Sequence, residues 1–234
     1  NLEVAGDINN KSTGTIDLGT GGVIAGQGDL NNENIIEMGT DGEITIAGNV
    51  NNKAGGELNF GDNGQMNVGK DLNNDGAIDM GNNGNLEVAG DINNKSTGTI
   101  DLGTGGMIVG NGDLNNDHLI DLGIGGEISI KGNINNNVTG TIDLGDNGKL
   151  GANGKIENKG LLKGDGMIDG IFNNYGTVVV SNKADGSNGS ITFDKGLNNY
   201  KDIYISNTSS KTAGNKVVVN GNYTGYADSA VYMN

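Results

Sequence analysis

The sequence contains no cysteine, proline, tryptophan or arginine. Without cysteine no disulfide can stabilise the fold, which suits an extracellular protein held together by stacking but is also common in the cytosol, so the compartment stays open. Without proline, almost every residue can donate its backbone N–H to a strand ladder or a turn. Aromatic residues make up only 4% of the chain, whereas glycine occurs 45 times. This composition excludes a large spherical core, and we expect a thin apolar column instead.

Positive charge is also scarce. All 14 cationic side chains are lysines, and the formal net charge is −15. Such a chain repels polyanions, so we expect no nucleic-acid partner. The longest apolar run is far too short to span a membrane. Because the chain begins with Asn1 instead of methionine, we expect it to be a piece of a longer protein whose signal peptide or membrane anchor lies elsewhere.

The chain is rich in internal repeats. Residues 1–32 recur almost unchanged as residues 85–116, with three differences: Val23/Met107, Ala25/Val109 and Gln27/Asn111. A shorter period lies inside this one, because Asn-Asn pairs recur at spacings that alternate between 22 and 20 residues, beginning at Asn9, Asn31, Asn51, Asn73, Asn93, Asn115 and Asn135. A period of this length with short alternating apolar runs is typical of a β-solenoid coil. We predict an all-β fold, a single-stranded parallel β-helix of about 10 coils of 20–22 residues.

Residues 31–50 illustrate one coil. Ile36 and Met38, and then Ile44 and Ile46, alternate with polar residues, which is the period-2 pattern of two half-buried strands. Val50 marks a shorter third strand. Equivalent inward positions recur along the chain: Ile16, Leu18, Ile24, Leu30, Leu58, Phe60, Met66, Val68, Leu72, Ile78, Met80, Leu86, Val88 and Ile92. At ~1.5–3 kcal/mol per buried aliphatic side chain, a coil is stable only when its neighbours seal it. Abundant Gly and Asn also fit disorder, which this spacing opposes except near residues 182–190.

Glycine and asparagine are expected at the corners of the coils. Gly-x-x-Gly boxes end the first strand of seven successive coils and predict tight turns with positive φ. They lack the strand–loop–helix context of a phosphate-binding loop, and Gly21-Gly22-Val23-Ile24 departs from the calcium-binding glycine repeat. The second asparagine of each pair is predicted to form a structural ladder with its stacked copies: Asn10, Asn32, Asn52, Asn74, Asn94, Asn116 and Asn136.

Charged residues form two predicted columns. The residue after each Asn pair alternates in sign, which favours one stacking register: Lys11, Glu33, Lys53, Asp75, Lys95 and Asp117. A second, outward column is acidic: Asp17, Glu37, Asn59, Asp79, Asp101, Asp121 and Asp143. Repulsion in that column should make some carboxyl groups hold cations or protonate more readily. Calcium requires six or more converging oxygens, so we favour a solvated stripe and predict no metal site and no cofactor.

The regular pattern ends at Ile156. We expect residues 1–156 to form regular coils and residues 157–234 to form irregular C-terminal coils and the capping region of the same β-helix. The first irregular unit, residues 157–172, has 16 residues, and a polar insert follows at residues 182–190. The last segment is enriched in tyrosine: Tyr200, Tyr204, Tyr223, Tyr226 and Tyr232. A changed terminal coil can cover strand edges that would otherwise promote aggregation.

Two segments resemble the passenger domain of a Gram-negative autotransporter of the type V secretion system. Asn74–Gly81 resembles the N-x-G-x-I-x-x-G rhythm of β-helical passengers, and Asn215–Gly225 resembles the L-x-V-x-G-x-Y-x-G segment near the passenger's C-terminal end. The resemblance implies a right-handed helix at the cell surface, secreted through a downstream translocator barrel and anchored by it to the outer membrane. The Asn, Ile and Lys bias is similar to that of the large fusobacterial adhesins.

This resemblance implies a monomeric rod that adheres, without catalysis, to a host-cell or bacterial surface receptor, either a protein or a glycan. The candidate contact residues are the differing positions of the two copies, all predicted to point outward: Val23, Ala25, Gln27, Met107, Val109 and Asn111. Exposed apolar side chains among them favour contact, although drift at unconstrained positions explains the same differences. The main alternative is a passive stalk that presents an upstream functional domain.

A polysaccharide-active enzyme is a further alternative, because such enzymes also use parallel β-helices and paired carboxylates can hydrolyse glycosidic bonds. Here every outward acid belongs to a repeating stripe without a unique cleft. The single histidine, His118, takes the place of Asn34 in the earlier copy. We therefore predict no catalytic residue and no enzymatic activity in this chain.

Overall fold

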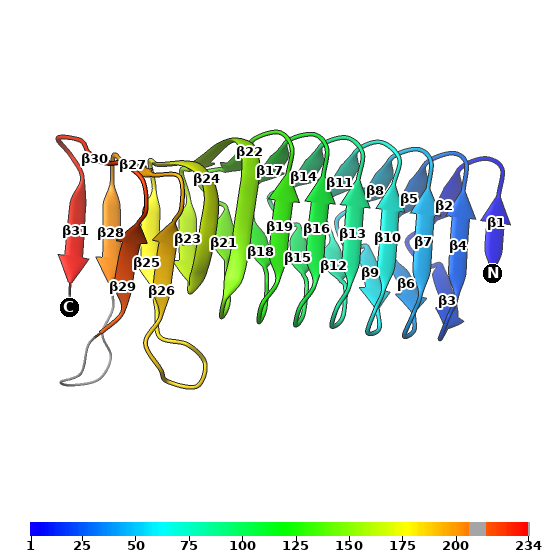
Figure 1. Ribbon diagram of the computed structural model, residues 1–234. Coiled ribbons are helices and arrows are strands. Elements are labelled where there is room, and N and C mark those ends of the chain that lie inside the picture. Colours follow the sequence, from blue (N-terminus) through cyan, green and yellow to red (C-terminus); the bar gives the residue numbers. More distant parts are fainter. Residues whose placement is uncertain (206–213, 234) are drawn as a thin grey trace.

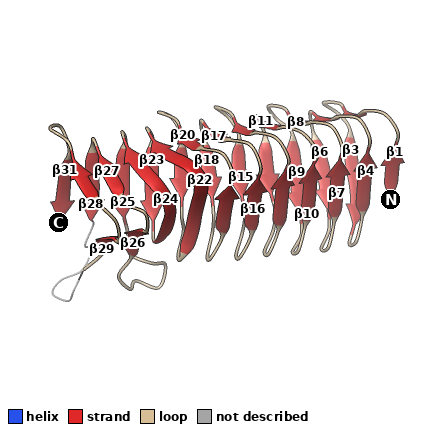
Figure 2. Ribbon diagram, turned by 45° about the horizontal axis from the view of Figure 1, so that its top comes forward, coloured by secondary structure: helices blue, strands red, loops and turns tan. Residues whose placement is uncertain are grey.

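The computed structural model of the protein describes residues 1–205 and 214–233. Through these residues the chain winds as an elongated β-solenoid of about ten turns, built from stacked parallel strands (Figure 1). The described residues form strands, turns and bends but no helix, so none could cross a membrane as a helix (Figure 2). At ~4.8 Å per turn, the stack is roughly 50 Å long. The predicted single-stranded parallel β-helix is confirmed.

Each turn contributes one strand to each of three faces. The first face, toward the viewer in Figure 1, contains β1 (Leu2–Val4), β4 (Val23–Gly26), β7 (Glu43–Ile46), β10 (Gln65–Val68), β13 (Asn85–Val88), β16 (Met107–Gly110), β19 (Glu127–Ile130), the first parts of β22 (Gly148–Asn158) and β24 (Gly166–Asn174), β26 (Ser190–Phe193) and β29 (Lys216–Val219).

The other two faces follow along each turn. The second face contains β2 (Ile8–Asn10), β5 (Leu30–Asn32), β8 (Val50–Asn52), β11 (Leu72–Asn74), β14 (Ile92–Asn94), β17 (Leu114–Asn116), β20 (Ile134–Asn136), the last parts of β22 and β24, β27 (Leu197–Asn199) and β30 (Tyr223–Gly225). The third face contains β3 (Thr15–Gly19), β6 (Ile35–Met38), β9 (Glu57–Phe60), β12 (Ala77–Asp79), β15 (Thr99–Asp101), β18 (Leu119–Asp121), β21 (Thr141–Asp143), β23 (Leu161–Gly164), β25 (Thr177–Val180), β28 (Asp202–Ile205) and β31 (Ala230–Met233).

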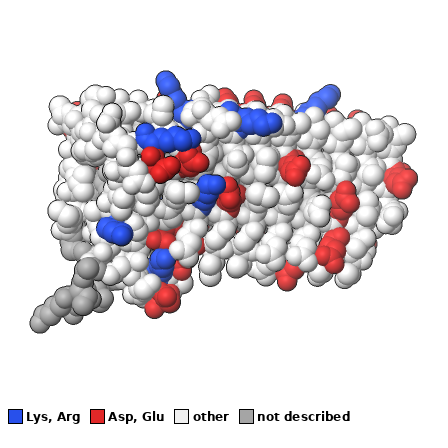
Figure 3. Space-filling model, in the orientation of Figure 1, with Lys and Arg blue, Asp and Glu red and all other residues white. Residues whose placement is uncertain are grey.

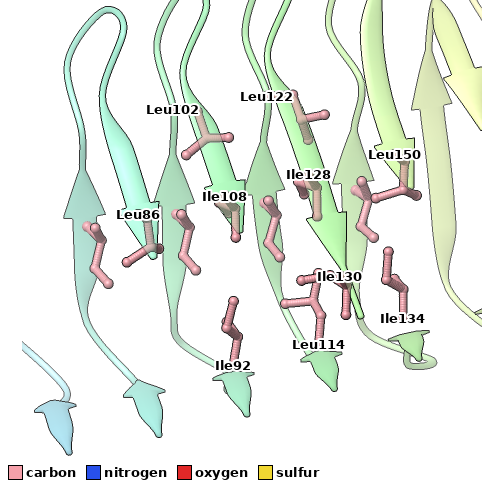
Figure 4. Close-up of a cluster of buried hydrophobic side chains, with 14 of the residues drawn as sticks. Leu86, Ile92, Leu102, Ile108, Leu114, Leu122, Ile128, Ile130, Ile134 and Leu150 are labelled. Carbon is pink, nitrogen blue, oxygen red and sulfur yellow. The ribbon is translucent and has the colours of Figure 1, made fainter. Parts of the chain in front are cut away.

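The core is a single apolar column along the axis. Leu86 on β13 pairs in register with Ile108 on β16, and Ile108 pairs with Ile128 on β19; all three are fully buried. Figure 4 shows side chains from the three faces converging in this column: Leu86, Ile92, Leu102, Ile108, Leu114, Leu122, Ile128, Ile130, Ile134 and Leu150. Since each coil is sealed by its neighbours, Ile16 and Leu18 in the first coil stay partly exposed.

Tight turns connect the third face to the first. In four of the Gly-x-x-Gly boxes the third residue is an Asp or Asn with φ between 55° and 60°: Asp41, Asn63, Asn83 and Asn147. The last glycine closes the turn, as where the Gly42 N–H donates to the Gly39 carbonyl at 3.0 Å. A side chain is excluded there, because a Cβ on Gly42 would lie 2.7 Å from the Met38 Cβ. The boxes are therefore structural turns.

Two asparagine ladders hold successive coils together on the second face. In the buried inner ladder, each amide donates to the amide oxygen of the next coil, as from Asn74 Nδ2 to Asn94 Oδ1 at 2.9 Å, and also to a backbone carbonyl, here Thr99 O at 3.0 Å. In the half-buried outer ladder the direction reverses, and Asn93 Nδ2 donates back to Asn73 Oδ1 at 3.1 Å. The inner ladder joins the seven predicted asparagines and continues through Asn158, Asn174 and Asn199.

The coils change after β20. β22 and β24 each run without interruption from the first face to the second. Gly151 of β22 pairs with Asp169 of β24, and Lys155 pairs with Ile171. Between these two pairs β24 is therefore two residues shorter than β22. Residues 181–189 form the loop between β25 and β26, and this loop contains the polar insert except for Ser190, which begins β26. There the Lys183 ammonium pairs with Asp165 at 3.3 Å. The insert therefore folds back onto an earlier coil.

Stacked tyrosines characterise the last coils. The Tyr175 and Tyr200 ring centroids are 4.4 Å apart, and those of Tyr200 and Tyr226 are 3.9 Å apart. Tyr204 and Tyr232 stack in the same manner on the third face. The autotransporter-like segment at residues 215–225 spans β29 and β30, which pair in parallel with β26 and β27.

Truncation of one core position should test the requirement for neighbouring coils. Leu18 and Leu102 lie in the same local sequence of the two 84-residue copies, but Leu102 is fully buried and Leu18 is not. We expect Leu102→Ala to lower the free energy of unfolding by ~2–5 kcal/mol and Leu18→Ala to lower it by less than half as much, as measured by denaturant unfolding. Equal losses would contradict the stacked-column account.

The inner ladder should tolerate no loss of donors. Asn74→Asp removes both hydrogens that Asn74 donates and sets a carboxylate against the Asn94 and Thr99 oxygens, so we expect a loss of about 3 kcal/mol or more at pH 7. Asn73→Asp, in the half-buried outer ladder of the same coil, is the matched control and should cost about 1 kcal/mol. Thermal unfolding monitored by circular dichroism compares the two variants, and similar melting temperatures would contradict the prediction.

Candidate functional site

A shallow groove of 360 Å³ runs parallel to the axis along the first face. We call it the axial groove. It crosses five coils, from β4 to β16, at the bend between the first and second faces. It is lined by Ala25, Gly26, Gln27, Thr45, Ile46, Ala47, Asn67, Val68, Gly69, Glu87, Val88, Ala89, Val109 and Asn111.

Small side chains at the bend create the axial groove. Ala47, Gly69 and Ala89 occupy equivalent exposed positions in three successive coils. Their backbone N–H groups are used between coils; for example, Ala89 N–H donates to Val68 O at 2.9 Å. Because these N–H groups are bonded and the side chains are small, the floor is mainly apolar. A partner therefore finds no free backbone N–H donor at these three positions.

One wall of the axial groove is polar. Thr45, Asn67 and Glu87 project from the middle of β7, β10 and β13. The Thr45 hydroxyl donates to Glu43 at 2.8 Å, and Asn85 Nδ2 donates to Glu87 at 3.0 Å. These contacts orient the wall, which offers hydroxyl, amide and carboxylate groups able to donate and accept hydrogen bonds. Among the described residues, no lysine lines this groove.

Charge is distributed unevenly over the first face. Figure 3 shows isolated carboxylates over its N-terminal half, and side chains of both signs toward the C-terminal half. In that second region Lys149 pairs with Glu127 at 2.7 Å and Lys195 pairs with Asp169 at 2.8 Å. These ion pairs lie beyond the end of the axial groove. The groove therefore combines a neutral floor with a weakly acidic wall.

The structure places the six candidate contact residues on the first face but in two separate groups. Val23, Ala25 and Gln27 belong to β4 and the following bend, whereas Met107, Val109 and Asn111 belong to β16 and its bend. The polar outward residues of β7, β10 and β13 separate the two groups, so they do not form one apolar patch. Four of them border opposite ends of the axial groove: Ala25, Gln27, Val109 and Asn111.

The residues between these groups were missed by the sequence analysis. Ala47, Gly69 and Ala89 follow the last inward residue of their strands at the same offset as Gln27 and Asn111. Alignment of the 20- and 22-residue units at that offset shows a run of small residues. This run of small residues is the sequence signal that predicts a hollow at the bend. The comparison of the 84-residue copies alone could not reveal it, because it does not align neighbouring coils.

The acidic column lies in register on the third face. Asp79, Asp101, Asp121 and Asp143 pair successively, and Lys163 ends the row with an ion pair to Asp143 at 2.6 Å. Partial burial, followed by the charges of Asp143 and Asp101, raises the pKa of Asp121, although the Gly123 N–H opposes this by donating to its carboxylate. Within the described residues, no group of three or more His, Cys, Asp or Glu side chains is placed to hold a metal ion.

The alternating column also lies in register, and several of its members are paired. Lys53 contacts Glu33 at 2.8 Å and Lys95 contacts Asp75 at 3.2 Å. The Lys53 hydrogen bond, together with the nearby Lys11 charge, lowers the pKa of Glu33. In the later coils this same column is occupied by the stacked tyrosines Tyr175, Tyr200 and Tyr226. Charge pairing therefore gives way to ring stacking along one column.

His118 is exposed beside the inner ladder, where Asn116 Nδ2 donates to its backbone carbonyl at 3.1 Å. This backbone contact is consistent with a structural position. Among the described residues that line the axial groove, Glu87 alone carries a titratable side chain, so the groove holds no acid–base pair.

Replacing Asp121 should relieve repulsion in the acidic column. Burial of Asp121, together with the charges of Asp143 and Asp101, raises its folded-state pKa above 3.8. The resulting cost of ionisation is present above the folded pKa and disappears as the pH falls below the ordinary value. Relief of facing like charges contributes ~0.2–1 kcal/mol, or roughly 0.4–4 °C for a chain of this size. We expect Asp121→Asn to raise the melting temperature at pH 7 and not at pH 3.

Asp17→Asn is the control for this measurement, because Asp17 stands at the end of the column and pairs with Glu37 alone. It should change the melting temperature less at pH 7. A gain for Asp121→Asn that persists at pH 3 would contradict the repulsion account.

Comparisons of the chain with protein-family models, with curated proteins and with solved structures found no match.

Proposed function

We propose that the protein is a non-catalytic binding rod of the bacterial cell surface, which adheres through its first face to a receptor on host cells or on other bacteria. The observation that carries this proposal is the axial groove, a neutral-floored hollow that crosses five coils of the first face. The rod would belong to an autotransporter passenger, held at the outer membrane by a translocator barrel outside this chain.

The physical properties of the rod support this role. Successive coils share backbone and asparagine hydrogen bonds, so the outward side chains sit on a rigid scaffold, and a rigid surface binds with less loss of conformational entropy. A net charge of −15 favours solubility of the rod. The resemblance of residues 215–225 to the C-terminal segment of autotransporter passengers supports the secretion route.

A passive stalk is the second candidate, and a specific observation favours it. Polar residues separate the two apolar groups on the first face, and other exposed apolar side chains, such as Ile124 and Val138, are isolated from them. A spacer needs only such a soluble surface. Binding measurements distinguish the two roles.

The test is binding of the labelled chain to epithelial cells and to partner bacteria. A first-face variant carries Val23→Ser, Ala25→Ser, Met107→Ser and Val109→Ser. We expect saturable binding by the native chain. The dissociation constant of the variant should be at least tenfold higher, which is equivalent to ~1.4 kcal/mol of binding free energy. The loss should arise because these side chains flank and border the axial groove.

The matched control carries Ile124→Ser and Val138→Ser, which remove exposed apolar side chains outside the first face. It should bind like the native chain. Absence of saturable binding to any cell type would support the stalk and contradict adhesion by this chain. Equal losses in both variants would contradict the first face as the contact surface.

A further inference from the structure

We infer that the axial groove binds a neutral, extended glycan chain that lies along the solenoid axis, with about one sugar unit over each coil. This inference rests on the proposed function, in which the first face is the contact surface, and names the ligand class of that face. Three features of the groove carry it: its length, its repeat distance and its polar groups.

The axial groove has the shape of a site for a linear polymer. It spans five coils, or roughly 19 Å along the axis at ~4.8 Å per coil. Its volume of 360 Å³ lies at the lower end of the ~300–1,000 Å³ typical of ligand sites. A hollow that is long but small in volume suits a narrow chain better than a compact ligand.

The repeat distance distinguishes a glycan from a peptide. The polar wall offers one side chain per coil, as Thr45, Asn67 and Glu87 show, so matching groups recur at ~4.8 Å. An extended peptide presents side chains to one face every two residues, at ~6.6 Å, and falls out of step within three coils. An extended pyranose chain advances by about one coil per ring. It can therefore present hydroxyl groups to the polar wall at every coil.

Strand addition by a peptide is also disfavoured. Peptides that bind to β-structures commonly pair with a free strand edge. In the axial groove the backbone N–H groups are already bonded to the preceding coil, as from Ala47 to Gly26 O at 2.9 Å and from Gly69 to Ile46 O at 2.7 Å. A peptide along the axis would find no such edge. A glycan chain binds through its hydroxyl groups and does not require a free strand edge.

The side-chain chemistry fits neutral sugar hydroxyls. Amides at Gln27, Asn67 and Asn111 can each donate and accept, the Thr45 hydroxyl, whose hydrogen goes to Glu43, can accept, and the Glu87 carboxylate can accept. The methyl groups of the alanines in the floor can pack against the apolar C–H faces of sugar rings. The described lining of the groove includes no lysine, and the net charge of −15 repels sulfated or uronate-rich polymers.

The experiment is a titration of the full 234-residue chain with neutral β-linked oligosaccharides, from the disaccharide to the hexasaccharide. Isothermal calorimetry and chemical-shift perturbation give affinity and location. We expect affinity to rise with chain length and to level off near five sugars, because one ring matches one coil. A sulfated oligosaccharide and a neutral extended peptide serve as competing probes and should bind at least tenfold more weakly.

Filling the axial groove tests its location. A double variant, Ala47→Leu with Ala89→Leu, places larger side chains on exposed floor positions without entering the core, and we expect at least a tenfold loss of affinity. The control Ala54→Leu alters an exposed alanine at another corner and should leave affinity unchanged. Thermal unfolding should confirm that both variants retain the native melting temperature.

A second pair of variants tests the polar wall. Asn67 on β10 lies in the axial groove, whereas Asn59 on β9 lies on the third face of the same coil. We expect Asn67→Ala to weaken binding severalfold and Asn59→Ala to leave it unchanged. Absence of oligosaccharide binding, preference for the sulfated or peptide probe, or full binding by the groove-filled variant would each overturn the glycan assignment.

The same reagents separate this inference from the proposed function. Cell binding that depends on the first face but is not competed by oligosaccharide would overturn the glycan assignment and leave adhesion in place. Suppose instead that the native chain binds oligosaccharide but no cell, and that the double variant with Ala47→Leu and Ala89→Leu loses the oligosaccharide. That outcome would support the groove as a glycan site and overturn adhesion.

Discussion

The buried asparagine ladder constrains the rest of the structure, because a polar group inside a coil can be satisfied only by its copies one coil away. Asparagine suits this position, since one amide accepts from the preceding coil and donates to the next; aspartate could not donate, and leucine could do neither. The ladder fixes the backbone around it. A Cβ on Gly56 would lie 2.7 Å from the Asn32 carbonyl oxygen, so glycine must follow Asn52 at that point. Among the described residues the inner ladder ends at Asn199, whose side-chain nitrogen has no partner because Gly225 occupies the next position.

The stacking of equivalent residues in successive coils also determines how charges are arranged on the surface. Any outward residue faces the equivalent residues of the coils above and below, so a charged position becomes a charged column. The chain uses three arrangements. Signs alternate after the asparagine pairs, as between Glu33 and Lys53 at 2.8 Å; tyrosines stack in the last coils; and carboxylates repeat on the third face, where the pKa of Asp121 is raised. The first two arrangements stabilise the register, whereas the third is tolerated because solvent screens much of the repulsion.

Much of the fold could be predicted from sequence because its constraints are strict and periodic. The strands around Ile36 and Met38, the tight turns and the asparagine column each recur once per coil, so a single unit defines their place. The axial groove could not be predicted in this way, because it results from small residues at outward positions where the core sets no requirement. Val23 and Met107 show why: they align across the 84-residue copies, but the fold places neighbours in these coils 20 or 22 residues apart, so three coils separate them. Family membership is still harder to predict from sequence. The pattern of residues 74–81 consists of an asparagine of the inner ladder, two core residues and a turn glycine, which the fold itself requires.

The contrast between core and outward positions bears on how a rod of this kind can acquire specificity. The interior accepts few changes, because a substitution at Asn74 or Leu102 affects contacts with two adjacent coils. The outward positions of the bend accept many, and the two 84-residue copies differ only on the first face and its bend. The axial groove ends at Asn111, and in the next coil the long side chain of Lys131 takes the equivalent bend position. The extent and the chemistry of the groove are thus both set by side chains that the core does not use. Binding properties can therefore change while the ladder, the turns and the apolar column remain the same.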